Sequence, residues 1–325
     1  MSANFTNPPE FPSCTGPDGI LYDFNYGARV LLPEGKWHVI LMDDDSGNIL
    51  FSCDTEGGWV TSNKKYYVRF RIQVFHQGSA SPVLDETLDM KDKPVVIFFP
   101  TGTLGDMLGW FHYAERFRQL HRCQLECVMG QEIIELLSAQ YPEITFSTKD
   151  NLQTVNPYAS WYVGLFFKGD TTHQPIDFRK VGFHRNAGYI LGVDPRECPP
   201  RLKLDAERKI AEPYVCIAAQ STNQAKYWNN GHGWAEVVAH LKSLGYRVLC
   251  IDRHAHYGQG FVWNHIPQGA EDFTGNIPLQ ERVDLLRHAS FFIGLGSGLS
   301  WLAWASGIPV VLISGFSLPN SEFYT

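Results

Sequence analysis

A short turn near residue 105 holds the first candidate for chemistry. Gly102, Gly105 and Asp106 follow an apolar run and open a helical stretch. An aspartate at a helix start is a good cap, and at the mouth of a cleft it could serve as a general base toward a hydroxyl. The glycine spacing excludes a dinucleotide fingerprint, and the turn lacks the Lys-Ser/Thr pair of a phosphate-binding P-loop. The segment offers Asp106 as a candidate base, with the cap as the purely structural alternative.

A second candidate follows the apolar run that begins at Tyr214. Ser221 and Thr222 are two adjacent hydroxyls, and Lys226 comes four residues after the second. Hydroxyls and an ammonium group together could bind a diphosphate, the hydroxyls by hydrogen bonds and the lysine as a point charge. Ligand loops of parallel sheets collect at strand ends. We therefore favour a donor-binding loop here over an ordinary polar loop.

A third candidate lies between residues 294 and 301. Gly296, Ser297, Gly298 and Leu299 stand between an apolar run and a helical pattern. Free backbone N–H groups at a helix start suit phosphate oxygens, and glycines permit close approach. Its spacing does not give the nucleophile elbow of serine hydrolases. Alone, a Gly-Ser-Gly turn is weak evidence, and its value depends on the other two segments.

All three candidates stand where a predicted strand meets a predicted helix. The first half reads as a strand at 95–99, a helix at 107–120, a strand near 125–128 and a helix at 131–139. The same order restarts with strands at 214–219, 247–252, 291–295 and 308–313, and helices at 234–244, 279–288 and 298–306. This alternation is typical of parallel α/β sheets. Two such halves imply a ligand cleft between them.

The residues before position 93 follow a different pattern. Apolar and polar residues alternate from about 28 to 89, most regularly at 67–74, and Asp43 to Gly47 form a turn between two strand-like runs. This predicts an antiparallel β module. We expect three domains: an antiparallel β domain at 1–92, a first Rossmann-like domain at 93–200 that ends in the proline-rich residues 194–201, and a second at 201–325. The last stops just beyond a strand, so we expect it to be incomplete.

Composition limits the classes of partner. The 325 residues carry 27 Lys+Arg and 34 Asp+Glu, a net charge of −7, with no basic run. Nucleic-acid binding is disfavoured because it requires a basic footprint. We also expect no membrane insertion, since no apolar run reaches spanning length. The seven scattered cysteines are typical of a cytoplasmic protein with reduced thiols, and Cys123 and Cys127 lack a second pair that would complete a metal site.

Taken together, the segments resemble the ADP-heptose glycosyltransferases of the GT-B fold. In that family a Gly-Asp turn carries the catalytic base, a hydroxyl-rich loop with a lysine binds the donor phosphates, and a glycine-rich helix start binds the nucleotide. The resemblance is sharpest to the bacterial autotransporter heptosyltransferases. It rests on Gly105-Asp106 and on the stretches 28–37, 221–236, 250–253, 257–264 and 296–300.

The resemblance implies heptose transfer from ADP-heptose to serines of an autotransporter adhesin, in the cytoplasm, by a large homo-oligomer. Where lipopolysaccharide heptosyltransferases usually carry Asp-Thr-Gly-Leu-Ser-His, this chain has Gly296 to Trp301, so donor contacts there must pass to backbone or other residues. This branch of the family also carries a four-cysteine iron-binding finger. No such cysteines occur before Thr325, so iron is expected only if a longer product supplies them.

We therefore predict inverting transfer by direct displacement, with Asp106 as base and Lys226, Ser221, Thr222 and the helix start at Ser297 to Leu299 stabilising the leaving diphosphate. No divalent cation is required if the lysine and the helix dipole take that role. Two alternatives stay open: a lipopolysaccharide core heptosyltransferase, and a nucleotide-sugar-binding module without catalysis.

Overall fold

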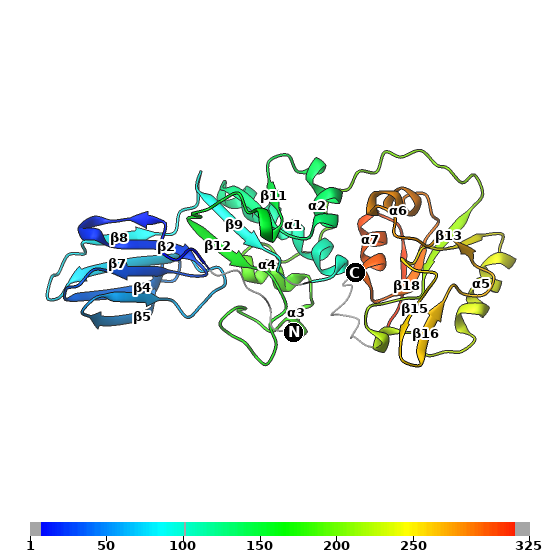
Figure 1. Ribbon diagram of the computed structural model, residues 1–325. Helices are drawn as coiled ribbons and strands as arrows, with labels where there is room; N and C mark the ends of the chain where they lie inside the picture. Colours follow the sequence, from blue (N-terminus) through cyan, green and yellow to red (C-terminus); the bar gives the residue numbers. More distant parts are fainter. Residues whose placement is uncertain (1–7, 101, 316–325) are drawn as a thin grey trace.

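The computed structural model describes residues 8–100 and 102–315. Three bodies follow one another along the molecule: a small β-sheet, a central α/β unit and a second α/β unit (Figure 1). Among the described residues no helix is long and apolar enough to cross a membrane.

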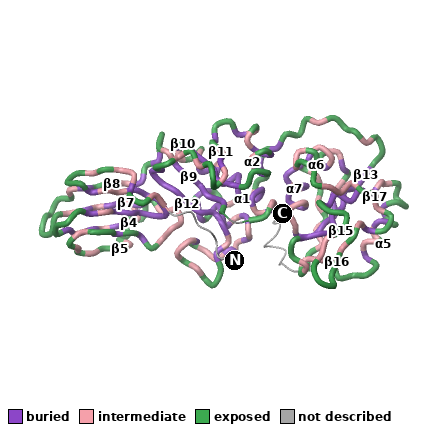
Figure 2. The backbone as a smooth tube through the Cα atoms, viewed as in Figure 1, coloured by how far each residue is buried: buried purple, intermediate pink, exposed green. Residues whose placement is uncertain are grey.

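The small sheet is antiparallel and projects from one end of the molecule. Its order is β5-β4-β7-β8, and the turn at Asp43 to Gly47 joins β4 to β5, with Asp43 opposite Asn48. Burial alternates along β4 and β7, whereas β5 is largely exposed, so one face packs inward and the other meets solvent (Figure 2). The predicted antiparallel hairpins are confirmed. The strands are β4 (Trp37–Asp43), β5 (Asn48–Thr55), β7 (Phe70–His76) and β8 (Leu84–Thr87).

The central unit is one eight-stranded sheet that draws strands from both predicted N-terminal domains. Its order is β11-β10-β9-β12-β2-β3-β6, with β1 paired to β2. β12 runs parallel to both β9 and β2. The boundary at residue 92 therefore does not separate two sheets, because β2, β3 and β6 extend the first Rossmann-like sheet. The strands are β1 (Cys14–Thr15), β2 (Leu21–Asn25), β3 (Arg29–Leu32), β6 (Gly58–Thr61), β9 (Pro94–Phe98), β10 (Gln124–Val128), β11 (Thr145–Ser147) and β12 (Ala159–Tyr162).

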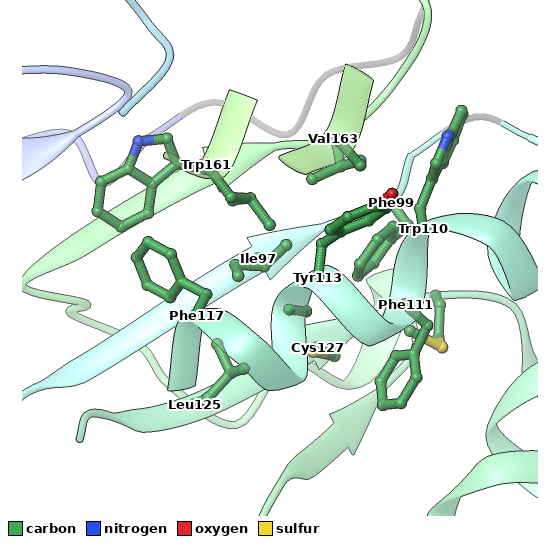
Figure 3. Close-up of a cluster of buried hydrophobic side chains, with 14 of the residues drawn as sticks. Ile97, Phe99, Trp110, Phe111, Tyr113, Phe117, Leu125, Cys127, Trp161 and Val163 are labelled. Carbon is green, nitrogen blue, oxygen red and sulfur yellow. The ribbon is translucent and has the colours of Figure 1, made fainter. Parts of the chain in front are cut away.

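Helix α1 forms the core of this unit by packing aromatic side chains on the sheet. Trp110, Phe111, Tyr113 and Phe117 are at most 1% exposed and lie with Trp161 of β12 and apolar residues of β9 and β10 (Figure 3). Burying side chains of this size contributes roughly 1.5–3 kcal/mol each, so α1 is firmly fixed on the sheet. The helices are α1 (Leu104–His121), α2 (Gln131–Leu137), α3 (Phe178–Val181) and α4 (Arg185–Leu191).

The second unit is a five-stranded parallel sheet of order β17-β14-β13-β18-β19. Its alternation of strands and helices follows the predicted pattern. A two-stranded antiparallel hairpin, β15 (His256–Gln259) and β16 (Val262–His265), was not predicted. The elements are β13 (Tyr214–Ala218), α5 (Gly233–Ser243), β14 (Arg247–Cys250), β17 (Glu271–Asp272), α6 (Leu279–Leu286), β18 (Phe292–Leu295), α7 (Gly298–Ala305) and β19 (Val310–Ile313).

Candidate functional site

The two α/β units meet where α1 and α7 begin, and glycines make that approach possible. A Cβ on Gly105 of α1 would stand 2.4 Å from Cδ1 of Trp301, and a Cβ on Gly298 of α7 would stand 2.8 Å from Cβ of Leu104. Real Cβ atoms essentially never come this close. The Gly-Asp turn and the glycine-rich helix start, which lie far apart in the sequence, thus meet where α1 packs against α7 (Figure 1).

Asp106 lies in the first turn of α1 and caps the helix with one carboxylate oxygen. Its Oδ2 accepts hydrogen bonds from the backbone N–H and the hydroxyl of Thr103, at 2.7 and 3.1 Å, which completes a capping box. In the described part of the chain no hydrogen bond to Oδ1 is recorded. The cap and the base role are therefore compatible, because one oxygen holds the helix and the other stays available to substrate.

The surroundings of Asp106 tune it toward proton acceptance. Burial raises the pKa of its carboxyl above the usual range, and the Thr103 hydrogen bonds and the charge of Lys226 oppose that shift. A raised pKa makes a carboxylate a stronger base. Gly102 shapes the turn before the helix, since its φ of +147° suits glycine and a Cβ there would stand 2.7 Å from Cε of Met107.

Lys226 comes from the other α/β unit and reaches the same space. It ends a short 3₁₀ turn, Gln224–Lys226, and its Nζ donates to the carbonyl of Gly296 at 2.7 Å. The charge of Lys226 also lowers the pKa of Asp106. The candidate base thus lies on one α/β unit and the candidate phosphate ligand on the other, at the ends of the elements that meet in the α1–α7 contact.

The start of α7 presents a second polar feature there. Ser297 is the N-cap residue, with extended backbone, and its buried Oγ has no hydrogen-bond partner among residues 8–100 and 102–315. Ser300 Oγ donates to the carbonyl of Leu295 at 2.5 Å, which fixes the strand-to-helix turn. Gly296 is buried, whereas Gly298 and Leu299 are half-buried. Unpaired N–H groups and a spare hydroxyl at a helix start suit a phosphate oxygen.

The loop after β13 holds the other two predicted donor residues in different surroundings. Ser221 is 8% exposed and its Oγ accepts from the N–H of Asn223 at 3.4 Å, whereas Thr222 is exposed. β13 is the neighbour of β18 in the sheet, so this loop and the start of α7 lie beside each other. Lys226 contacts Gly296 directly. Ser221 and Thr222 lie at the end of the neighbouring strand, β13.

Sequence reasoning missed the residue that holds this loop, Asp252. Its carboxylate is 2% exposed and accepts the backbone N–H groups of Ala219 and Gln220, at 2.8 and 3.2 Å. Burial raises its pKa to about 6. Arg282, also buried, donates to the carbonyls of Ile251 and Asp252. The sequence did offer a signal for Asp252, because an acid just after a buried strand lies at the sheet edge where parallel strand ends meet.

The β15–β16 hairpin, which was not predicted, accepts or donates hydrogen bonds at both ends of the donor loop after β13. Gln224 Nε2 donates to the carbonyls of Gln259 and Val262, both at 3.0 Å, and Asn264 Nδ2 donates to the carbonyl of Ala219 at 2.6 Å. The loop that carries Ser221 and Lys226 is therefore fixed at both ends within its own unit.

Metal ligands are not gathered in the described residues. No group of three or more His, Cys, Asp or Glu side chains there could hold a metal ion. All seven cysteines are free thiols, and burial raises the pKa of those at 123, 127, 216 and 250. These residues do not fit an iron site of four cysteines.

Two Rossmann-like units preceded by an antiparallel sheet are the architecture of the solved heptosyltransferases of the GT-B fold that the chain resembles, which confirms the predicted fold class. Residues 193–321 match glycosyltransferase family 9 (heptosyltransferase), and residues 16–78 match the N-terminal domain of the glycosyltransferase TibC. The enzyme class is thus a heptosyltransferase.

Comparison with individual relatives narrows the family to which the chain belongs. It is 75% identical over 325 residues to the autotransporter heptosyltransferase BAHTCr of Citrobacter rodentium, covering 100% of this chain and 80% of that protein. A dodecameric iron-containing heptosyltransferase, TibC, solved with ADP-D-β-D-heptose, matches with a TM-score of 0.97 and 75% identity over 99% of this chain and 84% of that one. The chain belongs to the autotransporter heptosyltransferase family.

One relative in the family differs from the others in its description. An autotransporter heptosyltransferase of Burkholderia thailandensis, BimC, is described as inactive and is 43% identical over 99% of this chain and 76% of its own length.

Proposed function

We propose that this protein transfers a heptosyl group from ADP-heptose to serine hydroxyls of an autotransporter adhesin, by inverting direct displacement. The observation that carries the proposal is that Asp106 of one unit is influenced by the charge of Lys226 of the other, while Lys226 donates to Gly296 just before α7. The solved TibC complex with ADP-heptose supports the identity of the donor. The names of the close relatives support an autotransporter as acceptor.

Asp106 acts as the general base in this mechanism. Its Oδ1 takes the proton of the serine hydroxyl while the serine oxygen attacks the anomeric carbon and the bond from that carbon to the diphosphate oxygen breaks. Oδ2 stays bonded to Thr103 throughout, so the carboxylate keeps its orientation while the proton moves. Attack on the face opposite the leaving group inverts the anomeric configuration.

The second unit stabilises the leaving ADP. Lys226 places its charge beside the start of α7, where Ser297 Oγ and the backbone N–H groups of the first helical turn lie at the positive end of the helix dipole. Ser221 and Thr222 add hydroxyls from the adjacent loop. Removing one preorganised donor of this kind costs on the order of 100-fold in rate. The lysine and the helix start supply this stabilisation without requiring a divalent cation.

The assembly proposed here follows a solved relative. TibC is described as dodecameric and iron-containing, and we propose a large homo-oligomer for this protein as well. If the protein binds iron, ligands outside the described residues would have to hold it. We place the enzyme in the cytoplasm, because its cysteines are all free thiols.

The test is a transfer assay read as intact protein mass. Wild-type protein, ADP-heptose and an unmodified autotransporter passenger fragment should give adducts of one heptose mass each. Asp106→Asn keeps the cap geometry and should lower the rate by about 100-fold or more, whereas Asp150→Asn, an equal charge change at an exposed acid, should not. ADP-heptose binding without any mass change would refute catalysis and leave a binding module.

A further inference from the structure

A buried histidine, His184, lies where the two α/β units touch. It is 2% exposed and stands directly before α4 of the central unit. Its ring lies against that of Trp301 of α7, with centroids 3.7 Å apart and an interplanar angle of 49°, and its centroid is 5.8 Å from that of Trp304. The imidazole of one unit is thus packed against the first helix turn of α7 in the other.

Glycines on one face of α1 make room for both rings. Gly105 and Gly109 are four residues apart, so they lie on the same face of the helix. A Cβ on Gly105 would overlap the Trp301 ring, and a Cβ on Gly109 would overlap the His184 ring. The two rings therefore lie side by side along α1, and His184 blocks movement of Trp301 from Gly105 toward Gly109.

The residues on either side of His184 are tied to the central unit. Trp110 of α1, which is 1% exposed, donates from Nε1 to the carbonyl of Phe183 at 2.8 Å. Asn186 of α4 is fully buried and donates from Nδ2 to the carbonyl of Gly164 at 3.1 Å. The backbone of His184 is therefore fixed on the central unit, and its ring is the part that reaches the second unit.

The imidazole contributes its shape rather than a charge. Its Nδ1 is buried and has no hydrogen-bond partner in the part of the chain that the structure describes, which is unfavourable for folding. Burial, followed by His112, lowers the pKa of His184 to about 3, so the ring is uncharged at neutral pH. What remains is a flat, rigid group between α1 and the side chain of Trp301.

We propose that His184 is a positioning residue for heptosyl transfer: its ring stops Trp301 from sliding along α1 and so fixes the start of α7 relative to Asp106. The proposal rests on the proposed function, which assigns the base and the donor contacts. Lys226 is bonded through its Nζ to the carbonyl of Gly296, directly before α7. A shift of α7 along α1 would therefore move the lysine and the donor contacts relative to the base.

Kinetics of His184→Ala in the transfer assay test this first. Without the ring, α7 can move along α1 by about 1 Å, so kcat should fall by about 100-fold. The Kd for ADP should stay within about threefold of wild type, because the predicted donor contacts lie in the second unit. The apparent pKa on the acidic side of the pH–rate profile should increase, because Lys226 lowers the pKa of Asp106 in wild type. A kcat within threefold of wild type, or a lowered kcat with an unshifted profile, would overturn the proposal.

His121→Ala is the matched control. His121 also packs on aromatic rings, and its Nε2 is likewise buried without a hydrogen-bond partner among the described residues. Burial lowers its pKa to about 4. It lies at the other end of α1, about 25 Å along the helix from Gly105, so its loss should leave kcat within about threefold of wild type.

Gly109→Ala tests whether the His184 ring is the obstacle at that point of α1. The three atoms nearest to a Cβ at position 109 all belong to this ring. Gly109→Ala should therefore lower kcat by about 100-fold in wild type but by less than about threefold in the His184→Ala background. Equal effects in the two backgrounds would contradict the positioning role.

Crystal structures separate this proposal from catalysis. The distance between the Cα atoms of Gly105 and Trp301 should differ by about 1 Å between wild type and His184→Ala. If His184→Ala does not fold, His184→Asn, which also shortens the side chain, takes its place. An unchanged distance would refute the positioning role even if transfer is lost. A changed distance, in a protein whose wild type transfers no heptose, would refute the proposed function alone.

Discussion

The contact between Gly105 and Trp301 gives the sharpest prediction about catalysis. A Cβ on Gly105 would stand 2.4 Å from Cδ1 of Trp301, whereas ordinary contact begins at 3.4 Å. The Trp301 ring is 5% exposed and packed against His184, with centroids 3.7 Å apart, so it cannot swing away cheaply. Gly105→Ala must therefore separate the starts of α1 and α7 by about 1 Å, which moves the candidate base away from the donor by a similar distance.

A displacement of about 1 Å can lower a rate by about 100-fold, so we expect Gly105→Ala to lower kcat to that extent. The Kd for ADP should stay within about threefold of wild type, because the predicted donor contacts lie in the second α/β unit. Calorimetric titration with ADP and the intact-mass transfer assay measure the two quantities. Gly130→Ala is the control, since a Cβ at that helix N-cap has no atom within 4 Å. A Gly105→Ala protein with kcat within threefold of wild type would refute this reasoning.

Three further predictions concern charge. Lys226→Gln should lower kcat on the order of 100-fold. The apparent pKa on the acidic side of the pH–rate profile should increase in this variant, because the charge of Lys226 lowers the pKa of Asp106. An unshifted profile would contradict this electrostatic interaction. In wild type, kcat should decrease as the pH is lowered through an apparent pKa above that of an ordinary carboxyl, because protonated Asp106 cannot act as a base. Asp106→Asn should abolish this acidic decrease in kcat. Asp252 has its pKa raised from 3.8 to about 6, so its contribution to stability is fully present below pH 3.8 and is lost as pH rises through 6. Relative to Asp252→Asn, wild type should lose on the order of 3 kcal/mol of unfolding free energy across that window, measured by urea denaturation, and an equal pH dependence in both proteins would contradict the assignment.

The sequence predicted the elements of both α/β units because their apolar runs are continuous and glycines mark their ends. The predicted helix at 107–120 is α1 at Leu104–His121, and the predicted strand at 214–219 is β13 at Tyr214–Ala218. β12 at Ala159–Tyr162 was not predicted. It is four residues long, with no alternation, and its place between β9 and β2 depends on pairing partners far away in sequence. Such register information is absent from local pattern.

The same distinction holds for the site. Strand-end position was enough to find Asp106 and Lys226 as candidates, because parallel strand ends share an edge. Their mutual approach depends on the packing of α1 against α7, which no local pattern encodes. A cavity of about 550 Å³ in the central unit was not predicted, since its walls come from segments far apart in the sequence: residues 8–10, the turn after β2, β3, β6, Lys65, the end of β12 and His173. The assignment of roles to the predicted site residues remains a prediction until the variants are measured.

Asp252 shows how the second unit gains a rigid donor loop at the expense of stability. An ionised carboxylate that is 2% exposed is unfavourable at neutral pH, as its raised pKa indicates. Its two bonds to Ala219 and Gln220 nevertheless fix the backbone that leads to Ser221. The hairpin fixes the other end through Gln224. The donor loop is thus held within its own unit, so its position relative to Asp106 depends on the contact between α1 and α7. Glycines line that contact, and we expect the transfer rate to be most sensitive to small structural changes there.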